Sequence, residues 1–96
     1  MHAAALRVEL LLRDVRSLKQ KRGRIKSLTH HLTAQFPVAV AEIDHQDLWK
    51  RSTLGVATIA AQAGQLERLI HSVVKWLENQ SEVEVLDVVT SYLAES

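Results

Sequence analysis

The sequence predicts an α+β fold in which four strands and two helices follow one another in a single domain. Stretches in which apolar and polar residues alternate, as in half-buried strands, are interleaved with two stretches whose apolar residues recur every three or four positions, as in amphipathic helices. Breaks are few, since the only proline is Pro37 and the glycines are Gly23, Gly55 and Gly64. With no linker, repeat or low-complexity segment visible, residues 1–96 are expected to form one domain.

Two elements are predicted in the first third of the chain. Residues 4–12 alternate between apolar and polar positions and predict a strand. Ser17, followed three residues later by Gln20, forms a capping box that opens a helix. That helix is expected to reach about Gln35, and Phe36-Pro37 closes it. Its apolar stripe consists of Leu18, Ile25, Leu28 and Leu32.

Four further elements follow. Residues 38–44 and 50–61 predict two strands joined by a polar turn around residues 45–47. A second helix begins near Gly64 and ends by Ser81, and its apolar stripe is the clearest in the chain. That stripe consists of Leu66, Leu69, Ile70, Val73, Val74 and Leu77. Residues 83–92 predict the fourth strand.

This β-α-β-β-α-β order is typical of a ferredoxin-like sandwich, a four-stranded antiparallel sheet with two helices on one face. Right-handed crossovers place the first and third strands in the centre. The outer face then carries residues such as Arg7 and Glu9, and is either in water or covered by a second copy. The third strand has two plausible buried faces, because the set containing Leu54 and Val56 and the set containing Gly55 and Ala57 both fit.

Composition narrows the class of protein. The chain has no cysteine, which excludes disulfides and thiolate chemistry. Its apolar runs are far shorter than the roughly 20 residues that cross a bilayer. The N-terminus has no basic region before its apolar stretch, so no signal peptide is expected. A cytoplasmic protein without membrane contact is the prediction.

Charge is distributed unevenly along the chain. Residues 13–26 hold seven of the twelve Lys and Arg residues and only one carboxylate, Asp14, a local charge of +6. The other 82 residues carry five cations and ten carboxylates, which brings the total to +1. Such asymmetry points to an anionic partner.

The basic segment coincides with the predicted start of the first helix. Cations in a first turn are unfavourable by about 0.3–1 kcal/mol each, because the helix N-terminus already carries partial positive charge. A bound anion such as phosphate would reverse that cost. The alternative is a solvated helix end whose long side chains lie over the sheet edge. The candidate contacts are Arg13, Arg16, Lys19, Lys21, Arg22, Arg24 and Lys26.

A second cluster of polar residues spans residues 42–51. Strand alternation predicts Glu42 and Asp44 on the same face. Asp44, His45 and Asp47 suggest a metal site or an acid–base pair on paper, but no recognised ligand spacing, nucleophile or cofactor motif accompanies them. We therefore expect no metal, no cofactor and no catalytic residue here.

An aromatic residue flanked by cations closes this cluster. Trp49, next to Lys50 and Arg51, is suited to stack on an unpaired base or to anchor an interface. The alternative is a tryptophan folded back over the hairpin. These three residues are the second candidate contact.

Two stretches together resemble a known family. The two stretches are Ser-Leu-Lys-x-Lys-Arg at residues 17–22 and Ala-Glu-Ile-Asp-His-Gln-Asp-Leu-Trp at residues 41–49, and Gly-Val-Ala at residues 55–57 accompanies them. The chain is similar to the small bacterial YlxP-like proteins of domain-of-unknown-function family 503. The resemblance runs from the first strand to about Val89. It implies a ferredoxin-like fold and, because such genes often neighbour those for translation initiation and ribosome-binding factor A, a role near translation or ribosome assembly. It implies no catalytic residues.

Three functions remain as hypotheses. The first is a non-enzymatic accessory protein that binds ribosomal RNA or a ribosomal subunit through the basic residues. The second is a homo-oligomeric or small-anion-binding module, with subunits joined through the sheet face or an edge strand. The third is an acylphosphatase-like enzyme, which the sequence disfavours because residues 13–16 lack the glycines that wrap a phosphate.

Overall fold

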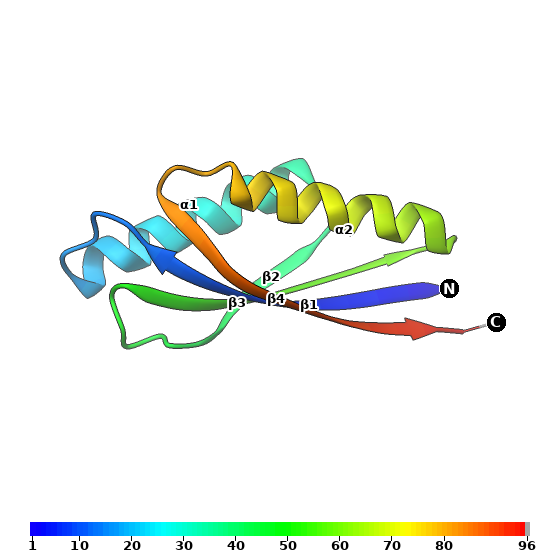
Figure 1. Cartoon of the computed structure of the whole chain (residues 1–96), viewed down its shortest axis with the longest axis horizontal. Helices are drawn as coiled ribbons and strands as arrows, with labels where there is room; N and C mark the ends of the chain where they lie inside the picture. The colour runs from blue at the N-terminus through cyan, green and yellow to red at the C-terminus, as the bar shows by residue number, and fades with distance from the viewer. Residues whose placement is uncertain (96) are drawn as a thin grey trace.

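The computed structural model describes residues 1–95 and has the predicted element order. One antiparallel sheet has the strand order β2-β3-β1-β4, and both helices cover the same face (Figure 1). The elements are β1 (His2–Leu12), α1 (Leu18–Gln35), β2 (Ala39–Asp44), β3 (Arg51–Ala60), α2 (Ala63–Glu78) and β4 (Val83–Ala94). The ferredoxin-like sandwich and the central position of the first and third strands are therefore confirmed.

The core lies between the helices and one face of the sheet. Cross-strand register places Leu54 beside Val8 and Val56 beside Leu6, and all four side chains are buried. The face of the third strand that packs against the helices is therefore the one carrying Leu54 and Val56. From the helices, this core receives Ile25, Leu28, Leu32, Leu66, Val73 and Leu77.

Helix α1 begins where the capping pattern predicts. Ser17 has extended backbone geometry, and its hydroxyl accepts a hydrogen bond from the Gln20 N–H at 3.1 Å. The Gln20 side chain reaches back to accept from the Arg16 N–H at 2.8 Å, one residue earlier than in a standard capping box. Local hydrogen bonds thus fix the residue at which α1 begins. The starting residue in turn determines which side of the helix each basic residue occupies.

A β-bulge in β2 corrects one expectation. The register between β2 and β3 shifts between Glu42 and Asp44, so that Glu42 pairs with Leu54 on the helix side and Asp44 pairs with Thr53 on the outer side. The two carboxylates therefore point to opposite faces, because the bulge breaks the period of two. The extra residue, Ile43, packs over Gly55, where an added Cβ would lie 3.1 Å from the Ile43 Cγ2.

The molecule is elongated, with extents of 47 × 21 × 19 Å. The start of α1, the β1–α1 loop and the β2–β3 loop lie at one end, and both chain termini lie at the other (Figure 1). Within residues 1–95, neither helix has the length and apolar character needed to cross a membrane. The same residues contain no cluster of metal-ligating side chains.

Candidate nucleic-acid interface

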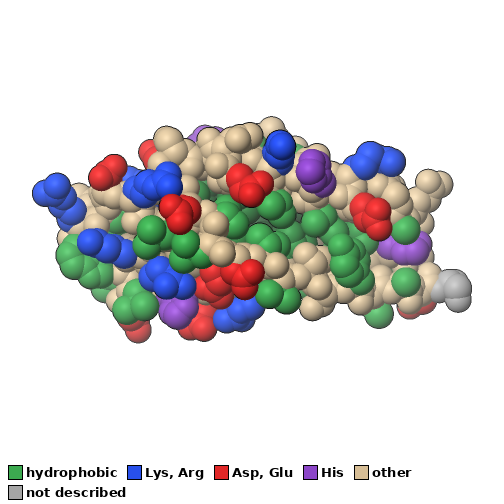
Figure 2. Space-filling view, viewed as in Figure 1, with side chains coloured by type: hydrophobic (Ala, Val, Ile, Leu, Met, Phe, Trp, Pro, Cys, Tyr) green, Lys and Arg blue, Asp and Glu red, His purple; other side chains and the backbone are tan. Residues whose placement is uncertain are grey.

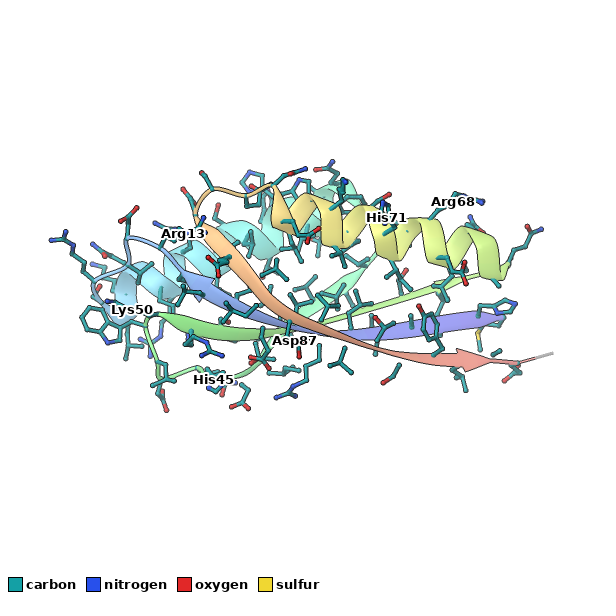
Figure 3. The ribbon with its side chains drawn as sticks, viewed as in Figure 1. Arg13, His45, Lys50, Arg68, His71 and Asp87 are labelled. Carbon is teal, nitrogen blue, oxygen red and sulfur yellow. The ribbon has the colours of Figure 1, made fainter. Side chains whose placement is uncertain are left out.

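Three segments meet at the end of the molecule opposite the termini. They are the β1–α1 loop (residues 13–17), the first turns of α1 and the β2–β3 loop (residues 45–50). The Leu12 N–H at the end of β1 donates to the Lys50 carbonyl at 2.8 Å, which holds the β2–β3 loop beside the start of the β1–α1 loop. Lys50 projects from this end of the structure (Figure 3). The fold thus brings the two basic clusters of the sequence together.

Helix α1 separates its cations onto two sides. Its buried stripe begins with Lys21 and continues through Ile25, Leu28 and Leu32 at spacings of four, three and four residues. Lys19, Arg22 and Lys26, three and four residues apart, lie on the opposite side and are exposed. None of these three forms an ion pair with any residue in the described part of the chain. They form one continuous basic stripe facing solvent.

Lys21 does not belong to that exposed stripe, which corrects the prediction that it contacts an anion. Its side chain is 1% exposed, and its ammonium lies 2.9 Å from the Glu42 Oε2. It also donates to the His45 carbonyl. Glu42 in turn accepts a hydrogen bond from the Ser52 hydroxyl at 2.6 Å. Lys21 therefore binds the helix start to β2 and the β2–β3 loop.

The charges of two further predicted contact residues are partly neutralised by carboxylates of strand β4 and of the loop before it. Arg13 pairs with Glu84 at 2.9 Å, and Arg24 pairs with Glu82 at 3.3 Å. Arg24 also donates to the Arg13 carbonyl at 2.7 Å. Arg13 remains half-exposed, so its cation is accessible but already has a partner. Both cations already have carboxylate partners and do not belong to the exposed stripe.

A hollow of about 340 Å³ lies between the β1–α1 loop and the β2–β3 loop. It is lined by Asp14, Val15, Arg16, Trp49 and Lys50. Trp49 is 43% exposed, so the side chain is neither wholly folded onto the hairpin nor free of it. An aromatic ring beside two cations in a shallow hollow can receive an unpaired base next to its phosphate.

Arg51 departs from the predicted second contact. It pairs with Leu11 in register on the outer face of the sheet, and its guanidinium lies 3.9 Å from a Glu9 carboxylate oxygen. Glu9 also accepts from the Thr53 hydroxyl at 2.7 Å and lies 3.8 Å from the His45 ring. Arg51 thus belongs to a polar network on the sheet rather than to the surface formed with Trp49.

Asp44 lies at the edge of the same polar network. Its carboxylate accepts a hydrogen bond from the His45 N–H at 2.8 Å and lies 3.2 Å from the Arg7 guanidinium. The hydrogen bond from the His45 backbone, followed by the nearby His45 and Arg7 charges, lowers the Asp44 pKa below 3.8. His45, with a positive φ of 59°, and Asp44 therefore serve to shape the β2–β3 loop.

The residues that remain accessible at this end define a surface that we call the basic end. Among residues 1–95, none of its five cations forms an ion pair, and the two loops contribute the exposed carboxylates of Asp14 and Asp47. Figure 2 shows several Lys and Arg side chains gathered at this end of the molecule. The basic end consists of Arg16, Lys19, Arg22, Lys26, Trp49 and Lys50.

Sequence reasoning missed the buried ion pair behind this surface. Glu42 was not expected to be the partner of Lys21, because strand alternation across an unseen bulge cannot place a carboxylate on the correct face. One signal was present, since Lys21 stands four residues before Ile25, where the apolar stripe would otherwise continue. A charged residue at a stripe position indicates a buried partner.

Comparison with known proteins gives a family. The model of a protein family of unknown function, DUF503, matches residues 3–90. The chain belongs to the DUF503 family. It is also similar to the uncharacterized protein YlxP of Bacillus subtilis (strain 168), with 30% identity over 76 residues that cover 79% of this chain and 83% of that protein. The predicted family is confirmed.

Proposed function

We propose that this DUF503 protein is a non-enzymatic cytoplasmic accessory factor that binds ribosomal RNA, alone or within a ribosomal subunit, through the basic end. The observation that carries the proposal is the exposed stripe of Lys19, Arg22 and Lys26. These cations stand on the solvent side of a helix whose inner side is fixed by the core, without carboxylate partners among residues 1–95.

The position of the stripe favours a polyanion. Lys19, the stripe cation in the first turn of α1, lowers helix stability slightly, and a phosphate backbone along α1 would convert that repulsion into attraction. Arg16 and Lys50 line the hollow together with Trp49 and Asp14, so an unpaired base there would have two cations near its phosphate. This arrangement favours single-stranded or loop RNA over a duplex, whose bases are not available for stacking.

The loop after β1 gives little support to phosphoryl chemistry. The Arg13 N–H donates to the Glu82 carbonyl at 2.9 Å, and the Arg16 N–H donates to the Gln20 side chain at 2.8 Å. Backbone N–H groups that cradle a phosphate must be free to point at it. We propose a non-enzymatic protein because these two backbone N–H groups of the loop are already bonded within the protein.

The test compares ribosomal subunits and ribosomal RNA fragments as ligands for the wild-type chain and two double variants. Lys19→Glu/Arg22→Glu reverses two charges of the basic end. Arg68→Glu/Lys75→Glu makes the same change of charge on exposed positions of α2 and is the matched control. Lys21 is left intact, because its loss would disturb folding.

We expect the wild type and the α2 variant to bind and the basic-end variant to lose binding. Equal binding by both variants, or no binding by the wild type, would contradict it. Tight binding of one small anion with weak salt dependence would instead identify a small-anion module.

A further inference from the structure

The sheet face away from the helices carries a mostly apolar patch at the end that holds the chain termini. We define this outer patch as Gly55, Ala57 and Ile59 of β3 with their register partners on the neighbouring strands, among which Arg7, the partner of Gly55, carries the one charge. The row through Ala57 joins Ala39, Ala5 and Ser91, none of them large or charged. No helix covers this side of the sheet (Figure 1).

Larger apolar side chains stand around this floor of small residues. Ile59 is 67% exposed, Leu93 is 60% exposed and Val89 is 52% exposed. Ile43 packs over Gly55 and is 45% exposed. Two adjoining hollows of about 450 and 540 Å³ share Ala5, Ala57 and Ser91 as lining residues. The patch therefore combines projecting side chains with depressions of the size that would receive them.

The charged residues of the outer face are paired among themselves, and Arg7, at the border of the patch, is one of them. The Arg7 guanidinium turns toward Asp44, at 3.2 Å, and Glu9, at 3.4 Å. His45 and Asp87 lie on the same side of the sheet, nearer the basic end (Figure 3). A border of this kind resembles the polar rim of an interface, because its charges need no partner from outside.

We propose that a second copy of this chain covers the outer patch, with the two sheets packed face to face. Twisted sheets pack best on sheets of the same twist, about 10 Å apart, and small residues in the centre permit that approach. A patch with both projections and hollows can be complementary to itself, as a two-fold interface requires. A polyanion would gain little from a surface whose one cation, Arg7, is already paired with Glu9 and Asp44.

The size of the outer patch fits a weak dimer. Two rows of four residues and one row of three cover about 350 Å² at ordinary strand and residue spacings. Two such patches bury roughly 700 Å² before the projecting side chains are counted, which is the range of weak, dissociating interfaces. The largest apolar patch of a typical monomer is about this size and is often functional.

The test is sedimentation equilibrium of the full chain from about 1 μM to about 1 mM, the range in which small interfaces dissociate. The key variant is Ala57→Glu. Ala57 is exposed and its neighbours Ala5 and Ala39 are small, so a single chain has room for the longer side chain. A dimer would bury the charge without a partner. Ala34→Glu, on the exposed side of α1, is the matched control.

We expect the wild type and Ala34→Glu to dimerise and Ala57→Glu to dissociate at least ~100-fold more readily. Circular dichroism shows whether each variant is folded, and Ser91→Glu, which lines the same hollows, replaces Ala57→Glu if that variant does not fold. A wild type that stays monomeric at the highest concentration would overturn the proposal. A dimer that the folded charge variant leaves unchanged would overturn it as well.

Discussion

Lys19 and Lys21 are two residues apart on α1, yet Lys21 is 1% exposed while Lys19 lies in the exposed stripe. The helix turns about 100° per residue, so the inner side of α1 receives Lys21 and the outer side receives Lys19. Lys21 pairs with Glu42 inside the protein. The comparison shows that one run of basic residues can contain a structural cation and a set of surface cations, which neither charge counts nor composition distinguish.

The largest effect is expected from the inner side. Lys21→Ala leaves the Glu42 carboxylate without its cation, and removing one partner of a buried pair costs about 3–5 kcal/mol. Urea denaturation measures the free energy of unfolding. Lys19→Ala is the control and should change it by less than about 0.5 kcal/mol.

A second variant separates charge from packing at the same position. Lys21→Met/Glu42→Gln removes both charges while keeping their approximate volume and an acceptor for the Ser52 hydroxyl. It should recover most of the stability that Lys21→Ala loses. If Lys21→Ala and Lys19→Ala are equally stable, the contrast between the two sides of α1 is wrong.

A smaller effect is expected at the start of the helix that carries both sides. Ser17→Ala removes the acceptor of the Gln20 N–H and should cost about 1 kcal/mol of unfolding free energy. Thermal or urea denaturation checks this value. Ser27→Ala, on the exposed surface further along α1, is the control, and an equal loss in both variants would argue against a specific cap at Ser17.

The smallest effect is expected from the exposed pair of Arg7 and Asp44, which contrasts with the buried pair. Because the Asp44 pKa is lowered in the folded state, its contribution to stability is present above about pH 3.8 and is lost as the pH falls through the folded pKa. The stability difference between the wild type and Asp44→Asn should therefore shrink below pH 3.8. A difference that grows toward acid would have the wrong sign.

Much of this molecule follows from sequence patterns. Period-two segments and two apolar stripes predicted every element, and Ser17 with Gln20 predicted the start of α1, because these signals are local. The bulge at Ile43 was not predicted, since bulges depend on pairing with another strand. The burial of Lys21 and the proximity of Arg51 to Glu9 could not be predicted from local sequence for the same reason, because both depend on contacts with other strands.

The outer side of α1 is the surface that we propose binds RNA, and the salt dependence of RNA binding is the sharpest test of that assignment. If about four cations of the basic end contact single-stranded phosphates, the logarithm of the binding constant should fall with the logarithm of salt concentration at a slope near −3. Lys19→Glu/Arg22→Glu should bind far more weakly, with a slope shallower by roughly 1.4, and Arg68→Glu/Lys75→Glu should match the wild type. Identical slopes and affinities for all three proteins would contradict the assignment of the basic end to RNA.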